Sequence, residues 1–396
     1  MQNKSGDLIA ALPERFLGEG APVDSRFRLR IGRITRDVVV HRGECHIEKS
    51  NGHKPDVEIK MDEATWAEID AGRLSGIEAF GQRRLIVRGS IENALRFEPL
   101  FGRPFAGGLR YSIEEVKTKR AKFSTLVAGD PLAEPLVLIH GLGATKASWL
   151  TVVPELAKHF RVMAVDLPGF GASSKPLGRY DASWFTGHMF DFFDALGVDD
   201  AIVAGNSMGG RIAQEMALTS PERIRAIACL CPATAFTNRP FLFFARIARA
   251  ELGVAVARLP RERLRSMLKQ MFADPTRIDP EWYDAAIDDF RYVWRNPRAR
   301  IAFFAAARRI YLEEGVGEEG FWARLSTMQV PALYIYGEKD TLITHHFARK
   351  VRKSLPAAKV QVWPDCGHTP QLEWPDRTAS TLLNFYEPHI ASQAAS

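Results

Sequence analysis

In the part of the chain before residue 115, hydrophobic and polar residues alternate in short segments. Phe27, Leu29 and Ile31 are interleaved with arginines, and the segments 57–61 and 85–87 repeat this period of two. Such a period is typical of a strand that buries one face and exposes the other. These segments are therefore expected to be strands.

Two short helical segments accompany these strands. Asp62 has the side chain of a helix N-cap, and the helix that it begins is expected to end at Gly72. A second helical segment, IENALRF, follows Ser90. Strands and helices in this order predict a small α+β unit with an antiparallel sheet. The histidines in the predicted strands and turns are interpreted as surface residues: His41, His46 and His53.

After residue 115 the pattern changes to a repeated order of strand, loop and helix. Several strand candidates are continuous apolar runs, as expected for strands buried on both faces of a parallel sheet. The repeated alternation predicts a doubly wound α/β domain. The strand candidates are residues 136–140, 161–166, 201–206, 224–231, 332–337 and 359–363.

A largely helical insertion interrupts this alternation between residues 233 and 327. Because a structureless loop of that length is implausible, a helical cap is expected over the carboxyl edge of the sheet, where ligands bind in such folds. Residues 240–272 mix Phe, Leu and Met with many arginines. We interpret them as a lid with an apolar inner face, and a surface that settles on anionic lipid is the alternative. The expected domains are residues 1–115 and residues 116–396.

Composition and charge restrict the class of protein. The chain has 396 residues, 46% hydrophobic and 25% charged, as in ordinary soluble globular proteins. A net charge of +6 is weak support for nucleic-acid binding, so no nucleic-acid partner is expected. The four cysteines fit neither a disulfide framework nor a zinc site, which favours a reducing compartment. The chain shows no secretory signal, and charged residues interrupt its best apolar stretch, residues 241–256, so a cytoplasmic location is expected.

The strongest chemical signal is Gly-Asn-Ser-Met-Gly at residues 205–209, between a predicted strand and a predicted helix. A serine on such a tight turn exposes its hydroxyl, and the flanking glycines permit a backbone approach that a Cβ atom would block. The N-terminal amides of the next helix favour developing negative charge. This context predicts that Ser207 is a nucleophile.

A second glycine-rich turn, residues 140–143, follows the first apolar strand. In a serine hydrolase one oxyanion donor comes from this loop and the other from the residue after the nucleophile. The backbone amides of Leu142 and Met208 are the expected donors, and Gly141 and Trp149 are the expected substrate contacts. An ordinary glycine turn that ends a strand is the alternative interpretation.

An acid and a histidine base are expected after the nucleophile, in the order Ser, Asp, His. Asp340 follows the strand candidate 332–337, and His368 lies on a turn after the next strand. Glu338 is the alternative acid, although it lies nearer the strand, and no carboxylate follows the strand that ends at Cys231. Other histidines are interpreted as surface or structural residues: His188, His345 and His346.

These motifs resemble the α/β-hydrolase fold superfamily over residues 116–396. The resemblance rests on HGLGATKASW, DLPGFGASSKP, GNSMGG, YGEKD and CGHTPQLEWP. Serine at the elbow disfavours the epoxide hydrolase and haloalkane dehalogenase branches, which have aspartate there. The first two motifs look most like monoacylglycerol lipases and carboxylesterases. GNSMGG is also similar to the C–C hydrolases of aromatic ring cleavage, but Ala144-Thr145-Lys146 departs from their usual Gly-Pro-Gly-type loop.

The N-terminal part resembles the sterol carrier protein 2 (SCP2) family of lipid-transfer domains. The resemblance rests on residues 55–97, PDVEIKMDEATWAEIDAGRLSGIEAFGQRRLIVRGSIENALRF, in which Gly81 and Gly89 bracket a strand. Members of that family enclose an apolar tunnel for acyl chains or sterols. The resemblance therefore implies a lipid-binding domain before the hydrolase.

Together these features predict a serine hydrolase that cleaves a lipophilic carboxylic ester, such as an acylglycerol, through an acyl-enzyme. Ser207 attacks the carbonyl, His368 takes its proton and Asp340 orients the imidazole, and no metal or organic cofactor is required. The expected partners are a hydrophobic ester or lipid and, peripherally, an anionic membrane surface. The alternatives are a C–C hydrolase of a vinylogous dienoate and a non-catalytic lipid carrier.

Overall fold

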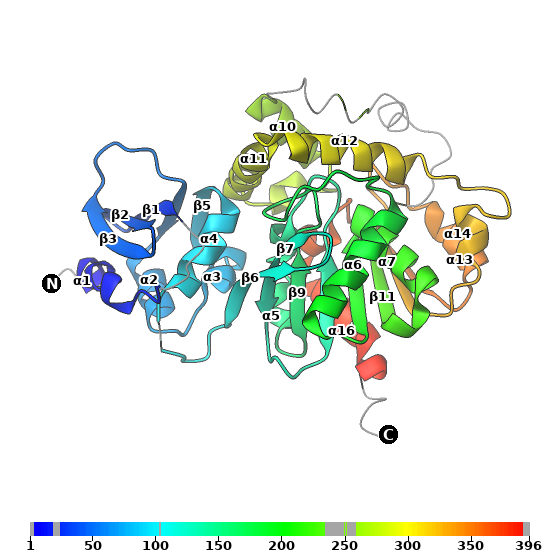
Figure 1. Ribbon diagram of the computed structural model, residues 1–396, viewed down its shortest axis with the longest axis horizontal. Helices are drawn as coiled ribbons and strands as arrows, with labels where there is room; N and C mark the ends of the chain where they lie inside the picture. Colours follow the sequence, from blue (N-terminus) through cyan, green and yellow to red (C-terminus); the bar gives the residue numbers. More distant parts are fainter. Residues whose placement is uncertain are drawn as a thin grey trace. The chain divides into compact units, whose positions relative to one another are not determined.

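The computed structural model describes residues 4–18, 24–102, 104–233, 249, 251 and 259–390. Contacts within the chain divide it into two compact units, which can be followed by colour in Figure 1. Unit 1 is Met1–Ile113 with Asp279–Tyr292, and unit 2 is Glu114–Ile278 with Val293–Ser396. A short segment of the predicted cap is thus a structural part of unit 1.

Unit 1 contains a five-stranded sheet in the order β3-β2-β1-β4-β5. The predicted strands are confirmed, but the prediction of an antiparallel sheet is wrong for one pair, because β1 and β4 run parallel. Side chains alternate between the two faces in both kinds of pairing, so the sequence pattern does not distinguish them. The strands are β1 (Ser25–Ile31), β2 (Ile34–His41), β3 (Glu44–Lys49), β4 (Val57–Met61) and β5 (Leu85–Gly89).

Two helices of unit 1 begin at the predicted caps. Asp62 Oδ1 accepts a hydrogen bond from the N–H of Thr65 (2.6 Å) at the start of α2 (Glu63–Asp70). Ser90 Oγ accepts from the N–H of Asn93 (3.2 Å) at the start of α4 (Ile91–Phe97). These side chains satisfy amides that have no partner within the first turn of a helix. Further helical segments of unit 1 are α1 (Lys4–Ala10), η1 (Pro13–Arg15), α3 (Gly76–Gly81) and η2 (Glu98–Leu100).

The helix α11 (Pro280–Trp294) contributes most of its length to unit 1. Arg88 of β5 forms ion pairs with two carboxylates of this helix, Glu281 and, at 3.2 Å, Asp284. The sequence pattern predicts a helix in this part of the cap but not that it completes the N-terminal unit. The buried apolar side chains of this segment include Tyr283, Ala285 and Ile287.

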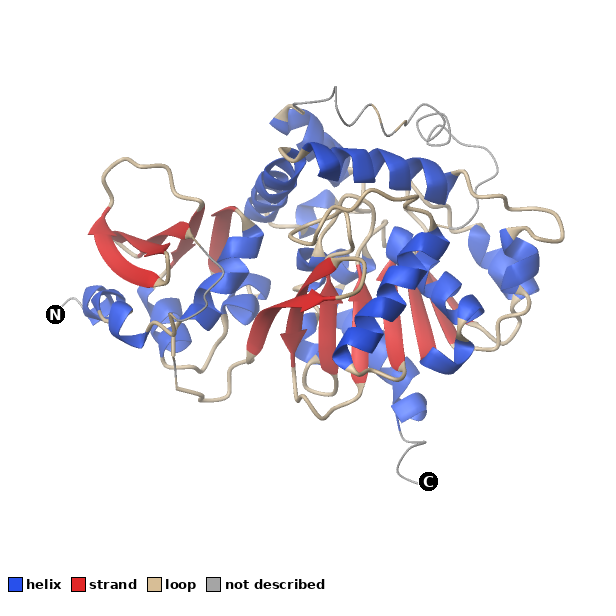
Figure 2. Cartoon of the chain, viewed as in Figure 1, coloured by secondary structure: helices blue, strands red, loops and turns tan. Residues whose placement is uncertain are grey.

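Unit 2 is built on an eight-stranded sheet in the order β13-β12-β11-β10-β8-β9-β7-β6, with helices in front of and behind it (Figure 2). The strands pair in parallel from β13 to β9, and β7 is antiparallel to β9. All six predicted strands are confirmed to within one residue at each end. The strands are β6 (Tyr111–Lys117), β7 (Lys122–Ala128), β8 (Pro135–Ile139), β9 (Arg161–Val165), β10 (Ala201–Asn206), β11 (Ile224–Leu230), β12 (Ala332–Gly337) and β13 (Lys359–Trp363).

The described part of the insertion is helical, as predicted. It contains α10 (Arg261–Lys269), η5 (Pro275–Arg277), α11, α12 (Pro297–Tyr311) and α13 (Phe321–Leu325). Most of the first part of the predicted cap, residues 234–258, lies outside the described residues. Elsewhere unit 2 has η3 (Lys146–Trp149), α5 (Val153–Leu156), α6 (Ala182–Leu196), α7 (Met208–Thr219), η4 (Pro221–Arg223), α14 (Phe347–Ser354), α15 (Pro370–Glu373) and α16 (Pro375–Ile390).

None of the helices in the described ranges combines the length and the apolar character that crossing a membrane requires.

Candidate active site

Ser207 lies on the tight turn between β10 and α7. Its backbone has φ 53° and ψ −114°, a conformation that L-residues rarely adopt. Its N–H donates to the carbonyl of Leu230 (2.9 Å), which pins the turn to the neighbouring strand. A strained residue held in this way presents its side chain at the carboxyl edge of the sheet.

The two glycines of the elbow are required by close backbone approach. A Cβ added to Gly205 would lie 2.2 Å from the carbonyl carbon of Gly209. A Cβ added to Gly209 would lie 2.1 Å from the carbonyl oxygen of Ile139. Both contacts are with backbone atoms, so a side chain at either position would displace α7 or β8.

Asp340 and His368 form a buried pair at the same edge of the sheet. His368 Nδ1 lies 2.7 Å from Asp340 Oδ2, and both side chains are at most 3% exposed. The other carboxylate oxygen, Oδ1, accepts from the N–H groups of Leu342 (2.7 Å) and Ile343 (2.8 Å). An acceptor-only carboxylate at Nδ1 leaves Nε2 of a neutral imidazole free to accept a proton.

Asn206 joins the elbow to the loop that carries His368. Its Nδ2 donates to the carbonyl oxygens of Leu230 (3.0 Å) and His368 (3.1 Å). The structure therefore places the loop of His368, and with it the His368–Asp340 pair, next to the elbow that carries Ser207. Among the described residues no hydrogen bond joins Ser207 Oγ directly to His368, as is common before substrate binds.

The other acid and base candidates lie apart from this cluster. Glu338 is exposed two residues before Asp340. His346 is exposed before α14, next to the half-buried His345. His188 is buried on α6, where Nδ1 lies 2.8 Å from the carbonyl oxygen of Trp184.

The two expected oxyanion donors are the N–H groups of Leu142, the residue after Gly141, and of Met208, the residue after Ser207. Within the described residues, neither the N–H of Leu142 nor that of Met208 donates a hydrogen bond to another group. Gly141 is adjacent to the nucleophile, because a Cβ added there would lie 3.3 Å from Ser207 Cβ. Trp149 lies in η3 with its side chain fully buried. Unengaged amides at a serine turn are the arrangement that stabilises an oxyanion.

A buried ion pair fixes the loop that carries Leu142. Lys146 Nζ lies 2.8 Å from Asp166 Oδ2 and donates to Ser124 Oγ (3.0 Å), while the N–H of Lys146 donates to Asp166 Oδ1 (2.7 Å). Burial disfavours a charged Asp166, but the charge of Lys146, together with the hydrogen bonds from its side chain and backbone N–H and the neighbouring His140, lowers the pKa of this carboxyl overall. The departure from the C–C hydrolase motif at Lys146 thus has a structural role.

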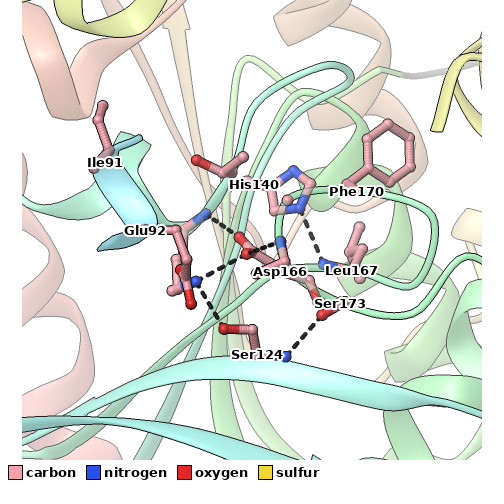
Figure 3. A network of polar contacts seen from close by, with 12 residues as sticks. Ile91, Glu92, Ser124, His140, Asp166, Leu167, Phe170 and Ser173 are labelled. Atoms are coloured by element: carbon pink, nitrogen blue, oxygen red, sulfur yellow. Dashed lines mark hydrogen bonds and ion pairs between the residues drawn. The ribbon is translucent and has the colours of Figure 1, made fainter. Parts of the chain in front are cut away.

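His140 supports the same loop, as Figure 3 shows beside Asp166 and Leu167. The N–H of Leu167 donates to His140 Nε2 (3.1 Å), so Nδ1 carries the proton and donates to the carbonyl of Gly141 (2.7 Å). Complete burial lowers the pKa of this imidazole, which keeps it neutral. His140 therefore has a structural role: it joins the loop at Gly141 to the backbone of Leu167.

Tyr311 is a site residue that the sequence analysis missed. It is the last residue of α12, and its hydroxyl lies 3.3 Å from Ser207 Oγ. No sequence signal marks it, because the motif of the elbow carries no information about which cap residue covers the serine.

Of the described residues, one group has a geometry that metal ions use. Atoms of Cys231, Asp340 and His368 lie within 4.8 Å of one another. Burial, followed by the charge of Asp340, raises the pKa of the Cys231 thiol well above its ordinary value. A metal needs the thiolate, and Asp340 is already bonded to His368, so this group fits a metal poorly.

Comparisons with known proteins agree with the two-part organisation. The sequence pattern of the alpha/beta hydrolase fold matches residues 134–375, and that of the SCP-2 sterol transfer family matches residues 22–102. Unit 1 is therefore an N-terminal SCP2 domain with a small sheet and helices.

Three curated relatives match the second part of the chain. The dihydrolipoyllysine-residue acetyltransferase component of the acetoin cleaving system from Pseudomonas putida is 31% identical over 64% of this chain, which spans only 64% of that relative's length. The 2-hydroxy-6-oxo-6-(2'-aminophenyl)hexa-2,4-dienoic acid hydrolase of Metapseudomonas resinovorans is 28% identical over 64% of this chain and 83% of its own. Monoacylglycerol lipase ABHD6 of Mus musculus is 25% identical over 65% of this chain and 77% of its own.

Among solved structures, a bacterial membrane phospholipase A described as a virulence factor is similar, with a TM-score of 0.59 and 27% identity. The match covers 71% of this chain and 87% of the phospholipase chain.

Proposed function

The chain belongs to the alpha/beta hydrolase fold family, and from this premise we propose that it is a serine hydrolase that cleaves a lipophilic carboxylic ester. One observation carries the proposal, namely that the strained elbow serine, Ser207, lies at the same sheet edge as the buried pair His368–Asp340. A nucleophile, a base and an acid that orients the base are the parts that acyl transfer needs.

In the proposed reaction Ser207 Oγ attacks the ester carbonyl and gives its proton to His368 Nε2, while Asp340 holds Nδ1. The amides of Leu142 and Met208 bind the oxyanion of the tetrahedral intermediate. His368 then protonates the leaving alcohol oxygen, and an acyl-enzyme remains on Ser207. In the second half His368 removes a proton from water, which hydrolyses the acyl-enzyme.

The lipophilic nature of the substrate is supported by the SCP2 domain and by relatives named as lipases. We propose that unit 1 binds an acyl chain or sterol and raises the local concentration of apolar substrate. Each buried methylene contributes about 0.8 kcal/mol to such binding, so long acyl chains gain most. Gly141 and Trp149 are the proposed substrate contacts of unit 2.

Contact with an anionic membrane surface is proposed for α10. This helix carries Arg261, Arg263, Arg265 and Lys269 against a single acidic residue, Glu262. Its Met267 is 55% exposed. Cations beside an exposed apolar side chain favour the interface of an anionic bilayer. Sedimentation with phosphatidylserine vesicles, compared with phosphatidylcholine vesicles, tests this contact.

A cytoplasmic location is proposed from the thiols. The four cysteines of the chain are free: Cys45, Cys229, Cys231 and Cys366. A reducing compartment preserves free thiols, and cell fractionation tests the location.

A C–C hydrolase of a vinylogous dienoate is the second candidate, favoured by the similarity to the dienoic acid hydrolase. Both reactions use a serine, a histidine and an aspartate, so the triad does not separate them. A direct comparison of nitrophenyl esters with a ring-cleavage dienoate does.

The test of the nucleophile uses the full chain and a fluorophosphonate probe. The wild-type chain is expected to be labelled, and Ser207→Ala is expected to lose labelling and at least about 10³-fold in kcat while folding normally. Ser326→Ala, which removes an exposed hydroxyl, serves as the matched control. A chain-length series of nitrophenyl esters then defines the acyl preference. Labelling of Ser207→Ala at the wild-type rate would overturn the assignment.

A further inference from the structure

The hydroxyl of Tyr311 is placed at the nucleophile by the cap, 3.3 Å from Ser207 Oγ. The side chain is 5% exposed. Burial raises the pKa of the phenol to about 12, so the group remains a neutral donor at physiological pH. Neither proton transfer nor oxyanion binding in the proposed reaction uses this donor.

An ion cluster around the buried Arg211 fixes Tyr311 relative to Ser207. Glu313, two residues after Tyr311, accepts from Arg211 Nε at 2.6 Å. Arg211 is fully buried on α7, pairs also with Glu215 (2.7 Å), and donates from its backbone N–H to the carbonyl of Ser207 (3.1 Å). Burial disfavours a charged guanidinium, but the two carboxylates outweigh burial and raise the pKa of Arg211. One residue therefore ties both the nucleophile and the end of the cap helix to α7.

A hydrogen-bond donor next to Ser207 Oγ is close to the leaving-group atom of the substrate during the reaction. In the tetrahedral intermediate the leaving-group atom is bonded to the same carbon as Oγ. The oxyanion on that carbon is already served by the amides of Leu142 and Met208. An alcohol oxygen accepts a hydrogen bond well, whereas sulfur accepts weakly. A phenol in this place therefore distinguishes an oxygen leaving group from a sulfur one.

We propose that Tyr311 donates a hydrogen bond to the leaving-group oxygen and thereby selects oxygen esters over thioesters. The inference rests on the proposed function and names the substrate class of the same site. When the C–O bond breaks, its electron pair goes to the leaving oxygen, which takes the proton from His368, and the acyl group stays on Ser207. Tyr311 keeps its own proton throughout, so its contribution is stabilisation of the transition state.

The experiment compares two substrates that differ in one atom, ethyl hexanoate and S-ethyl thiohexanoate, on the full chain. Tyr311→Phe is expected to lower kcat/KM for the oxygen ester about tenfold, the scale of one hydrogen bond. The loss for the thioester is expected to stay below about twofold, because sulfur uses the donor little. The loss is expected in kcat rather than KM.

Two further variants complete the test. Tyr386→Phe removes another buried tyrosine hydroxyl, which donates to the carbonyl of Val203 (3.2 Å), and is expected to leave the oxygen-to-sulfur ratio unchanged. Glu313→Gln keeps Tyr311 but weakens the ion pair with Arg211 that holds the end of α12. It is expected to lower the ratio of kcat/KM for the oxygen ester to kcat/KM for the thioester, by a smaller factor than Tyr311→Phe. If Tyr311→Phe folds poorly, the same ratio measured on Glu313→Gln tests the proposal: a lowered ratio supports the role of Tyr311, and an unchanged ratio contradicts it.

The outcomes separate the two proposals. If Tyr311→Phe lowers kcat/KM equally for both esters, or for neither, the proposed role of Tyr311 is wrong. Labelling of Ser207 by the fluorophosphonate would still support the proposed hydrolase function in that case. A wild-type chain that neither labels nor cleaves any ester would overturn the proposed function, and the role of Tyr311 with it.

Discussion

The backbone N–H of His368 donates to the carbonyl oxygen of Met271, 2.6 Å away, so a residue of the cap insertion holds the loop of the proposed base. Gly367 has no room for a side chain here, since a Cβ would lie 2.4 Å from the same oxygen. Thr341 Oγ1 donates to the carbonyl of Gln270 (2.9 Å), which joins the cap to the loop of Asp340 as well. Movement of this cap segment would therefore move both proposed catalytic side chains.

Glu373 is expected to control how firmly that junction is held. Its Oε1 accepts from the N–H of Asp274 (2.9 Å) and its Oε2 from the N–H of Gly367 (2.7 Å), with the side chain fully buried. Glu373→Gln points an NH₂ group at one of these donors, which costs about 1–3 kcal/mol for a buried unsatisfied group. Urea unfolding should show this loss, and kcat should fall with it. The matched control is Glu387→Gln on the exposed face of α16, and equal stability of the two variants would contradict the prediction.

The acid is tested by charge removal at Asp340. Asp340→Asn is expected to fold normally and to lose about 10⁴-fold in kcat, because His368 loses its tautomer and its counter-charge. Glu338→Gln, two residues earlier and exposed, is the control and should retain full activity. A large loss of kcat in Glu338→Gln would instead assign the acid to Glu338.

Cys231 offers a relocation test of the same idea. Its sulfur lies within 4.8 Å of the ligand atoms of Asp340 and His368. The double variant Cys231→Asp with Asp340→Asn introduces a carboxylate at this position. Its kcat is expected to be at least about tenfold higher than that of Asp340→Asn alone, because a tenfold change in rate needs only about 1.4 kcal/mol. No recovery in a folded double variant would show that position 231 does not reach Nδ1.

The framework of unit 2 is predictable from the sequence because its central strands are apolar on both faces, a pattern typical of a buried parallel sheet. The proximity of Asp340 and His368 follows from it, since each residue lies in the loop after one of two parallel neighbouring strands, β12 and β13. Their catalytic roles remain predictions. The place of Tyr311 is not predictable in this way, because the contacts of a cap helix depend on tertiary packing. The same holds for α11, whose membership of unit 1 depends on partners as distant in sequence as Arg88.

The loop that carries Leu142, one of the two proposed oxyanion donors, depends on the buried Lys146–Asp166 pair. Lys146→Met leaves Asp166 charged and buried without its cation, which typically costs about 3–5 kcal/mol. In the wild-type chain the lowered pKa of Asp166 adds stability that is fully present above its unfolded pKa of about 3.9 and is lost as the pH falls through the folded value. In Lys146→Met burial raises this pKa, so stability should decline as the pH rises above about 4.

The measurement is urea unfolding at pH 5 and pH 8. The stability difference between wild type and Lys146→Met should be larger at pH 8. Lys158→Met removes a lysine with a 64% exposed side chain and should change little at either pH. A difference that does not grow with pH would mean that Asp166 is not the group responsible.

Unit 1 depends on a carboxylate that the cap insertion supplies. The N–H of Ile91, the first residue of α4, donates to Oδ1 of Asp289 on α11 (3.2 Å), and Asp289 is 7% exposed. The positive end of α4 favours this negative charge. Asp289→Ala leaves the buried amide unsatisfied and should destabilise unit 1 by about 1–3 kcal/mol. Asp289→Asn keeps an acceptor oxygen and should cost less.

Hydrogen exchange over residues 85–97 measures this dependence directly. Exchange should quicken most in Asp289→Ala, while Asp376→Ala at the exposed start of α16 leaves it unchanged. Because unit 1 is proposed to bind an acyl chain, a fluorescent fatty acid should bind more weakly to Asp289→Ala. Turnover of a butyryl ester should fall less in this variant than turnover of a long-chain ester, since a short chain gains little from a second apolar site. Unchanged exchange in Asp289→Ala would show that α4 does not need the helix from the cap.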